Sequence, residues 1–99
     1  MASDWYFSSP SARAFVETLE PELRAEWKDV MKELLRDPEP DDEQRVTLGP
    51  PFPAGLIGTW TGSFWIAYRL INREVVEVAN VYWSPESPRY RGPQPGLFL

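Results

Sequence analysis

The amino-acid sequence predicts an α+β fold in which a short strand and a helical hairpin precede an antiparallel sheet of three to four strands. The first observation is length, because 99 residues make one domain, taken as 1–99, with one hydrophobic core. The second is an apolar stripe of helical period between residues 20 and 38. The third is a series of β-branched and aromatic segments, separated by turn residues, after residue 55.

The N-terminal elements follow from local signals. Residues 4–8 are short and aromatic, which predicts a first strand. Ser9 is a favourable helix N-cap and Pro10 suits the first helical position, so a helix is expected to run to about Leu19.

A second helix is expected from Pro21 until Pro38 ends it. Its apolar residues fall on one face of period 3.6: Leu23, Trp27, Val30, Met31, Leu34 and Leu35. Because almost no loop separates the two helices, they are expected to form an αα-hairpin.

The second half of the chain predicts a meander. An acidic linker at 39–43 and a loop at 49–55 are rich in Pro, Gly and acids. Strands are expected at 45–48, 56–61, 64–71 and 75–83. The tail, 84–99, is too rich in Pro for a strand, and its apolar end, 97–99, is expected to fold back onto the sheet or to bury in a dimer.

Alternation assigns side chains to the two faces of this sheet. The helix-covered side is expected to hold Phe64, Ile66, Tyr68 and Leu70. We call the opposite side of the sheet the open face. It is expected to hold Trp65, Ala67 and Arg69, together with Glu77, Ala79, Val81, Trp83 and Trp60. So aromatic a face predicts a binding surface, although this register turns Asn80 toward the core.

Composition excludes several chemistries. The chain has no Cys and no His, so it has no thiolate nucleophile, no Cys-ligated zinc and no imidazole base. We therefore expect no metal and no cofactor. Fifteen acids against ten bases give a net charge of −5, with the acids concentrated in the helical half. A chain that grips phosphate backbones non-specifically is normally basic, so any contact with nucleic acid is expected from the second half alone.

Targeting signals are not recognised in the sequence. The first ten residues lack the basic and apolar regions of a signal peptide, and no apolar run approaches the roughly 18 residues of a membrane span. A cytoplasmic location without membrane contact is therefore expected.

Two segments resemble the RelE/ParE toxin superfamily. Residues 11–38, which close in Leu34-Leu35-Arg36-Asp37-Pro38, are similar to its helix hairpin, commonly ending in L-x-x-D/N-P. Residues 55–71 and 75–78 are similar to its sheet pattern "G-L…G-x-Y-R-I-x-Y-x-I…V-x-V". The resemblance covers about residues 5–83 and implies the toxin of a type II toxin–antitoxin module.

The resemblance also implies partners. Members of this superfamily are neutralised by an antitoxin whose C-terminal segment wraps the toxin. RelE-like members cut mRNA on the ribosome, with basic residues and a Tyr in place of His, and ParE-like members act on DNA gyrase. Here Trp65 stands at the family's sheet arginine, the basic position on the preceding strand falls near Gly58 or Trp60, and the basic residue after the last strand falls near Pro85.

The catalytic candidates that remain are Arg69 and the Arg89-Tyr90-Arg91 cluster, which matches the family's habit of a Tyr near the C-terminus, and Arg45 is a less direct candidate. Arg69 has two interpretations, a phosphate contact or a cross-strand pair with Glu77. Tyr90 likewise has two interpretations, as a catalytic residue or as an aromatic side chain that anchors the C-terminal tail.

The partner-binding candidates are Trp60, Trp65, Arg69 and Trp83. The leading hypothesis is a toxin or toxin homologue that binds a cognate antitoxin over the open face. The alternatives are a non-catalytic interaction module with a Trp-lined groove, a ribosome-dependent mRNA endoribonuclease, and an unrelated α+β adaptor. Whether the chain is an enzyme, and whether it forms a homodimer, stays open at this point.

Overall fold

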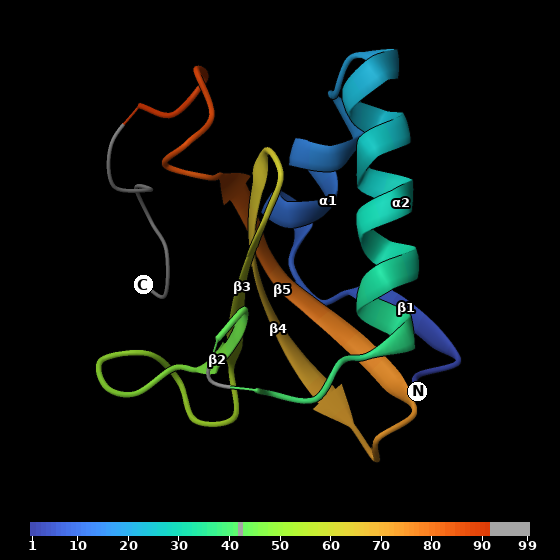
Figure 1. Cartoon of the computed structure of the whole chain (residues 1–99), viewed down its shortest axis with the longest axis vertical. Coiled ribbons are helices and arrows are strands. Elements are labelled where there is room, and N and C mark those ends of the chain that lie inside the picture. Colours follow the sequence, from blue (N-terminus) through green and yellow to red (C-terminus); the bar gives the residue numbers. More distant parts are fainter. Residues whose placement is uncertain (42, 92–99) are drawn as a thin grey trace.

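Two helices pack on one side of a single five-stranded sheet in this computed structural model, which describes residues 1–41 and 43–91 (Figure 1). The elements in chain order are β1 (Asp4–Phe7), α1 (Pro10–Glu17), α2 (Pro21–Arg36), β2 (Arg45–Thr47), β3 (Ile57–Thr61), β4 (Phe64–Ile71) and β5 (Val75–Trp83). The sheet order is β1-β5-β4-β3-β2. The strands β2 to β5 pair antiparallel, whereas β1 joins the edge of β5 in parallel. The predicted α+β order is confirmed, and the N-terminal strand adds a fifth strand to the meander.

The helix boundaries follow from capping. The Ser9 hydroxyl accepts a hydrogen bond from the Ala12 N–H at 3.3 Å, and Pro10 occupies the first turn, as predicted. The first helix is two residues shorter than expected, because Thr18 caps its C-terminal end by donating its backbone N–H to Ala14 O at 3.1 Å. The second helix begins at Pro21 as predicted.

The core lies between α2 and the sheet. The predicted stripe of α2 is buried at Trp27, Val30, Met31 and Leu34, and it faces Phe64, Ile66 and Tyr68 of β4. The Trp27 ring meets Phe64 edge-on at 5.7 Å and stacks on Phe7 of β1 at 6.1 Å. Aromatic contacts of this kind contribute beyond their buried area, so Trp27 joins the helix to the central strand β4 and to the edge strand β1.

Tyr68 is a polar group within this core. It is fully buried, and its hydroxyl donates a hydrogen bond of 2.6 Å to the carbonyl of Pro38, the second residue after α2. Burial raises the pKa of Tyr68 well above its usual value, so its hydroxyl remains a donor at any ordinary pH.

A β-bulge in β5 changes which side chains face the helices. Ala67 pairs with Asn80, but the next residue of β4, Tyr68, pairs with Val78, so β5 carries one extra residue at Ala79. The alternation shifts there by one position. Val81 is consequently 1% exposed and belongs to the core.

The expectation that Val81 and Trp83 lie on the open face is therefore wrong. Trp83 packs against the core, stacked on Phe64 at 5.9 Å and edge-on to Phe15 at 4.9 Å. The same shift turns Asn80 away from the core, which removes the conflict that an uninterrupted strand would create.

The acidic linker before β2 is organised by one carboxylate. The Asp41 Oδ1 accepts the backbone N–H groups of Glu43, Gln44 and Arg45, each at 2.9 Å. The hydrogen bonds from Arg45 and Glu43 lower the pKa of Asp41 most. These hydrogen bonds order the backbone at the beginning of β2, the short strand predicted at residues 45–48.

The segment after β5 folds as successive turns over residues 84–91, the described part of the predicted tail. The Ser87 N–H donates to Ser84 O at 2.8 Å, and the Tyr90 N–H donates to Ser87 O at 3.1 Å. The apolar end at 97–99, predicted to fold back or to bury in a dimer, lies outside the described residues.

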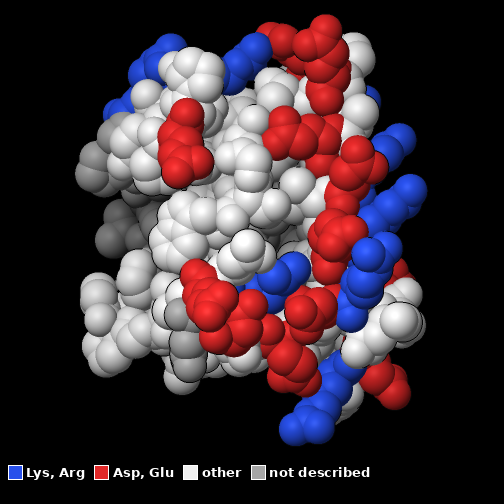
Figure 2. Space-filling model, in the orientation of Figure 1, with Lys and Arg blue, Asp and Glu red and all other residues white. Residues whose placement is uncertain are grey.

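Charge is distributed unevenly over the surface. Figure 2 shows acidic side chains running along α2 and gathered around the linker, with Lys and Arg residues between them on the helix. Within residues 1–41 and 43–91, no helix is long and apolar enough to cross a membrane.

Candidate partner-binding face

The open face carries a polar half and an aromatic half. Along β4 it shows Trp65 and Arg69, and β3 contributes Trp60 directly opposite Trp65. On β5, Glu77 lies opposite Arg69 and Tyr82 opposite Trp65. In Figure 1 the helices lie on the other side of these strands.

Arg69 and Glu77 form the centre of the polar half. The Arg69 Nη1 lies 3.0 Å from Glu77 Oε1, and the Arg69 Nε donates to Ala54 O at 3.4 Å. Tyr6 of β1 donates its hydroxyl to the other Glu77 oxygen at 2.7 Å. This hydrogen bond and the carboxylate charge raise the pKa of Tyr6. The predicted cross-strand pair is confirmed, so the charge of Arg69 is already balanced by a half-buried carboxylate.

The aromatic half is built from four rings. Trp60 meets Trp65 edge-on with 6.3 Å between ring centroids, and Tyr82 meets Tyr90 at 6.3 Å. Trp60 is 46% exposed, a large value for so apolar a side chain within a strand. Contiguous aromatic surface of this type is characteristic of protein-binding sites.

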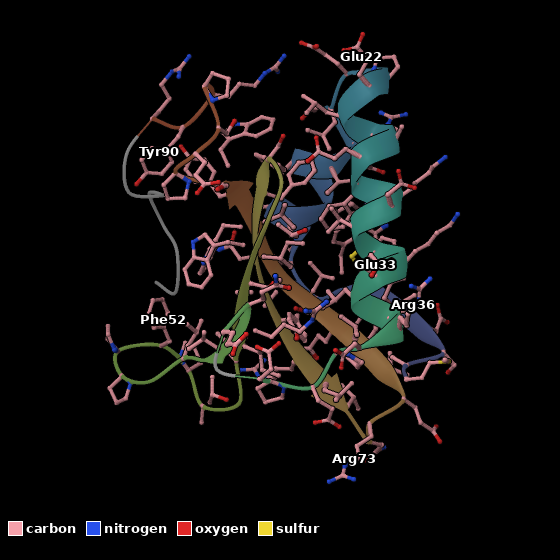
Figure 3. All side chains as sticks on the ribbon, in the orientation of Figure 1. Glu22, Glu33, Arg36, Phe52, Arg73 and Tyr90 are labelled. Carbon is pink, nitrogen blue, oxygen red and sulfur yellow. The ribbon has the colours of Figure 1, made fainter. Side chains whose placement is uncertain are left out.

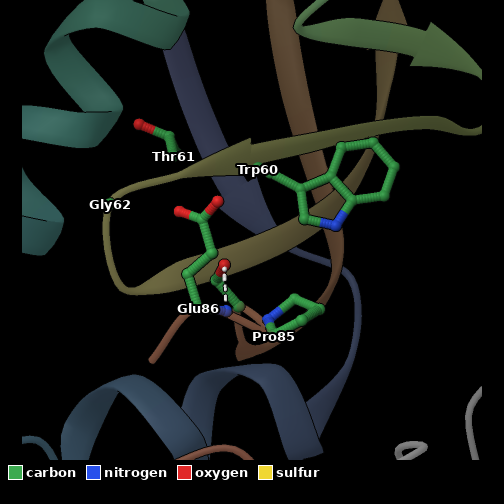
Figure 4. A pocket seen from close by; sticks show the side chains of 6 residues that line it. Trp60, Thr61, Gly62, Pro85 and Glu86 are labelled. Carbon is green, nitrogen blue, oxygen red and sulfur yellow. Dashed lines mark hydrogen bonds between the residues drawn. The ribbon is translucent and has the colours of Figure 1, made fainter. Parts of the chain in front are cut away.

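A pocket of about 260 Å³ opens beside Trp60 (Figure 4). Its lining combines the end of β3 with the segment after β5: Trp60, Thr61, Gly62, Ser84, Pro85 and Glu86. The Ser84 N–H donates to Ser63 O at 2.8 Å, and the Ser84 Oγ accepts the Glu86 N–H at 3.3 Å. These two hydrogen bonds fix Glu86 against the β3–β4 turn.

No sequence pattern singles out Glu86 or Ser84 as site residues. They lie just after a long strand in a Pro-rich stretch, and the strand pairing of β3, β4 and β5 together with the hydrogen bond to Ser63 brings them to Trp60. An acid immediately after a strand is a weak signal, since most such residues are solvated loop positions.

The predicted Arg89-Tyr90-Arg91 cluster lies at the far end of the sheet. The Arg89 Nη2 pairs with Glu20 Oε1 at 2.7 Å, and its guanidinium carbon lies 5.5 Å from the centroid of the Trp83 ring. The Arg91 Nη1 donates to the carbonyls of Pro88 and Tyr90 at 3.1 and 3.2 Å. The contact of Tyr90 with Tyr82 fits its interpretation as an anchor for the tail.

The structure does not bring Arg69 and Tyr90 together. Tyr90 contacts Tyr82, which pairs with Trp65, and Arg69 lies four residues further along β4, or about 13 Å of strand. Figure 3 agrees, because Tyr90 and Arg73 of the β4–β5 turn lie at opposite ends of the sheet. A single catalytic centre formed by both is therefore not assembled in this conformation.

Arg45 is also separate from the open face. It lines a pocket of about 140 Å³ under α2, together with Glu33, Leu34 and Thr59. Its Nε is buried and, within the part of the chain that the structure describes, has no hydrogen-bond partner. Over the same residues no group of three or more His, Cys, Asp or Glu is placed to hold a metal ion.

Comparisons with known proteins support the fold. No family model and no curated protein sequence matches the chain. Among solved structures, a chain of the toxin–antitoxin complex RelBE2 from Mycobacterium tuberculosis is similar, with a TM-score of 0.66 and 20% sequence identity. The match covers 85% of this chain and the whole of that chain. At this identity the similarity establishes a RelE-like fold, two helices against a five-stranded sheet.

Proposed function

We propose that this chain is the toxin, or a toxin homologue, of a type II toxin–antitoxin module, and that an antitoxin segment binds over its open face. The RelE-like fold supports the first part, since the similar chain comes from a toxin–antitoxin complex. Trp60 supports the second part, because it is 46% exposed and lies beside Trp65 on the face of the sheet opposite α1 and α2. Trp is enriched at the centres of protein interfaces.

The charges favour a protein partner over a phosphate backbone. Arg69 pairs with Glu77 and Arg89 pairs with Glu20, so an RNA phosphate would have to displace a carboxylate from each. The net charge of −5 opposes RNA binding further. An mRNA endoribonuclease that uses Arg69 and Tyr90 is thus the less favoured function, and inhibition of a protein target such as DNA gyrase needs no such residues.

Growth of a bacterial host after tightly controlled expression tests the toxin proposal. The wild-type chain is compared with an Arg69→Ala, Tyr90→Ala double variant and with Lys28→Ala, an exposed change on α2. Growth arrest by all three supports a toxin that acts by binding a protein. Normal growth with soluble wild-type chain contradicts an active toxin in that host.

Transcript mapping separates the endoribonuclease. Arrest that the double variant loses, together with cut transcripts in cells expressing the wild-type chain, would assign the activity to RNA cleavage. Affinity for RNA should then fall steeply with salt, whereas binding through a Trp-rich face should change little.

If the wild-type chain arrests growth, a genetic selection for restored growth can identify its antitoxin. Genes from the source genome that restore growth are recovered, and their products are tested for binding to the purified chain. A suppressor protein that binds wild type and Lys28→Ala but not a Trp60→Ala, Trp65→Ala variant supports the open face as its site. Equal binding to all three would place the antitoxin elsewhere.

A further inference from the structure

The pocket beside Trp60 has one apolar wall and one negative charge. The wall is the exposed indole of Trp60 with Pro85, and the charge is the exposed carboxylate of Glu86 (Figure 4). Within residues 1–41 and 43–91, the Glu86 carboxylate makes no ion pair and no hydrogen bond; only its backbone N–H is engaged, by Ser84. An aromatic face and an unpaired carboxylate in one hollow are the two groups that attract an organic cation.

An anionic ligand does not suit this pocket. Glu86 would repel a phosphate or carboxylate, and the described residues that line the pocket include no Lys or Arg. The nearby Arg89 already pairs with Glu20, and Arg91 donates to backbone carbonyls. At about 260 Å³ the pocket lies below the roughly 300–1,000 Å³ of small-molecule sites, so it suits one side chain better than a nucleotide.

The pocket is held in shape before any ligand arrives. The β3–β4 turn is fixed from α2 by Glu26, which accepts the Ser63 N–H and hydroxyl at 2.7 and 2.9 Å. Ser84 is 2% exposed and joins the turn to the segment that carries Glu86. A preformed site avoids much of the ordering cost of binding.

We propose that this pocket receives a lysine or arginine side chain from the protein segment that binds the open face, with the cation between the Trp60 ring and the Glu86 carboxylate. This rests on the proposed function only for the identity of the segment. Glu86 makes this contact negative, so the contact suits a partner that is basic there, since complementary charge speeds association and fixes orientation.

Titration of the ¹⁵N-labelled full chain with N-acetyl-arginine amide tests the pocket without any antitoxin. The probe should shift the indole N–H resonance of Trp60, assigned with a Trp60→Phe variant. N-acetyl-citrulline amide, which has the same shape without the charge, should shift it at least about threefold less. Glu86→Gln should reduce the shift that the arginine probe causes by a similar factor. Glu43→Gln, which changes an exposed acid of the linker, should leave that shift unchanged.

Equal shifts with arginine and citrulline, no shift with either, or an unchanged response in Glu86→Gln would overturn the proposal. An unaltered spectrum of the free Glu86→Gln variant shows that it folds. The two proposals fail separately. Growth arrest without an arginine-specific shift rejects only the pocket, and an arginine-specific shift in a chain that does not arrest growth rejects only the active toxin.

Discussion

Glu26 of α2 accepts both hydrogen bonds that Ser63 can donate, from the backbone N–H at 2.7 Å and from the hydroxyl at 2.9 Å, across 37 residues of sequence. The contact fastens the helix to the β3–β4 turn, next to Trp60 and the pocket. Gly62, the other turn residue, has a φ of +56°, and a Cβ there would collide with the Glu26 carboxylate. The contact of Glu26 with Ser63 and Gly62 therefore makes α2 constrain the conformation of the β3–β4 turn, which lies at the candidate site.

Gly62→Ala should destabilise the protein by about 1–2 kcal/mol, because the left-handed backbone disfavours a Cβ and the Glu26 oxygen must move away. Glu26→Ala should cost a similar amount through loss of two charge-assisted hydrogen bonds. Urea unfolding of both single variants and the double variant measures their coupling. The double variant should lose less than the sum, and strict additivity would show that the two residues do not interact.

Tyr68→Phe should lower the free energy of unfolding by about 1–2 kcal/mol, because the Pro38 carbonyl loses the donor that satisfies it at the end of α2. Tyr6→Phe is the matched control. It also removes a hydroxyl with a 2.7 Å hydrogen bond, but at an exposed site, and should stay within about 0.5 kcal/mol of wild type. Equal losses in the two variants would contradict the buried role of the Tyr68 hydroxyl.

Because of the bulge in β5, the same valine-to-threonine substitution should lower the stability clearly at one position of the strand and very little at another. Val81→Thr places a hydroxyl in the core and should cost about 1–3 kcal/mol. Val75→Thr, on the same strand but before the bulge and only half-buried, should cost less than about 0.5 kcal/mol. Thermal unfolding by circular dichroism distinguishes them. A tolerated Val81→Thr would mean that the strand keeps uninterrupted alternation.

Asp41→Asn should destabilise the protein at neutral pH and much less in acid. The backbone N–H groups of Arg45 and Glu43 favour the ionised carboxylate, so the pKa of Asp41 is lower in the folded chain than in the unfolded one. Such a group contributes its stability above its unfolded pKa of about 4, and the contribution is lost as the pH falls through the folded pKa. Urea midpoints of wild type and variant should therefore converge below about pH 4. A difference that persists there would point to a cause other than charge.

The candidate site was only partly predictable from sequence. The positions of Trp60 and Trp65 on the open face and the pairing of Arg69 with Glu77 follow from strand alternation, and all three features are present, with Trp60 exposed and Trp65 half-buried. Uninterrupted alternation places Trp83 on the wrong face, because one extra residue at Ala79 reverses the alternation, and the local signal is a single polar residue, Asn80, that the uninterrupted register turns toward the core. Glu86 could not be recognised, because its neighbour Trp60 lies more than twenty residues earlier in the chain.

The helices and strands were predictable from the sequence. Caps, prolines and periodicity are local signals, and they placed both helices, the hairpin turns and the strands close to their observed bounds. The register of β5 beyond its bulge, the pairing of Arg89 with Glu20, and the pocket between Trp60 and Glu86 follow from the packed structure alone. These features depend on contacts between residues far apart in the chain, whose free energies arise only once the helix, the turn and the segment after β5 are packed together.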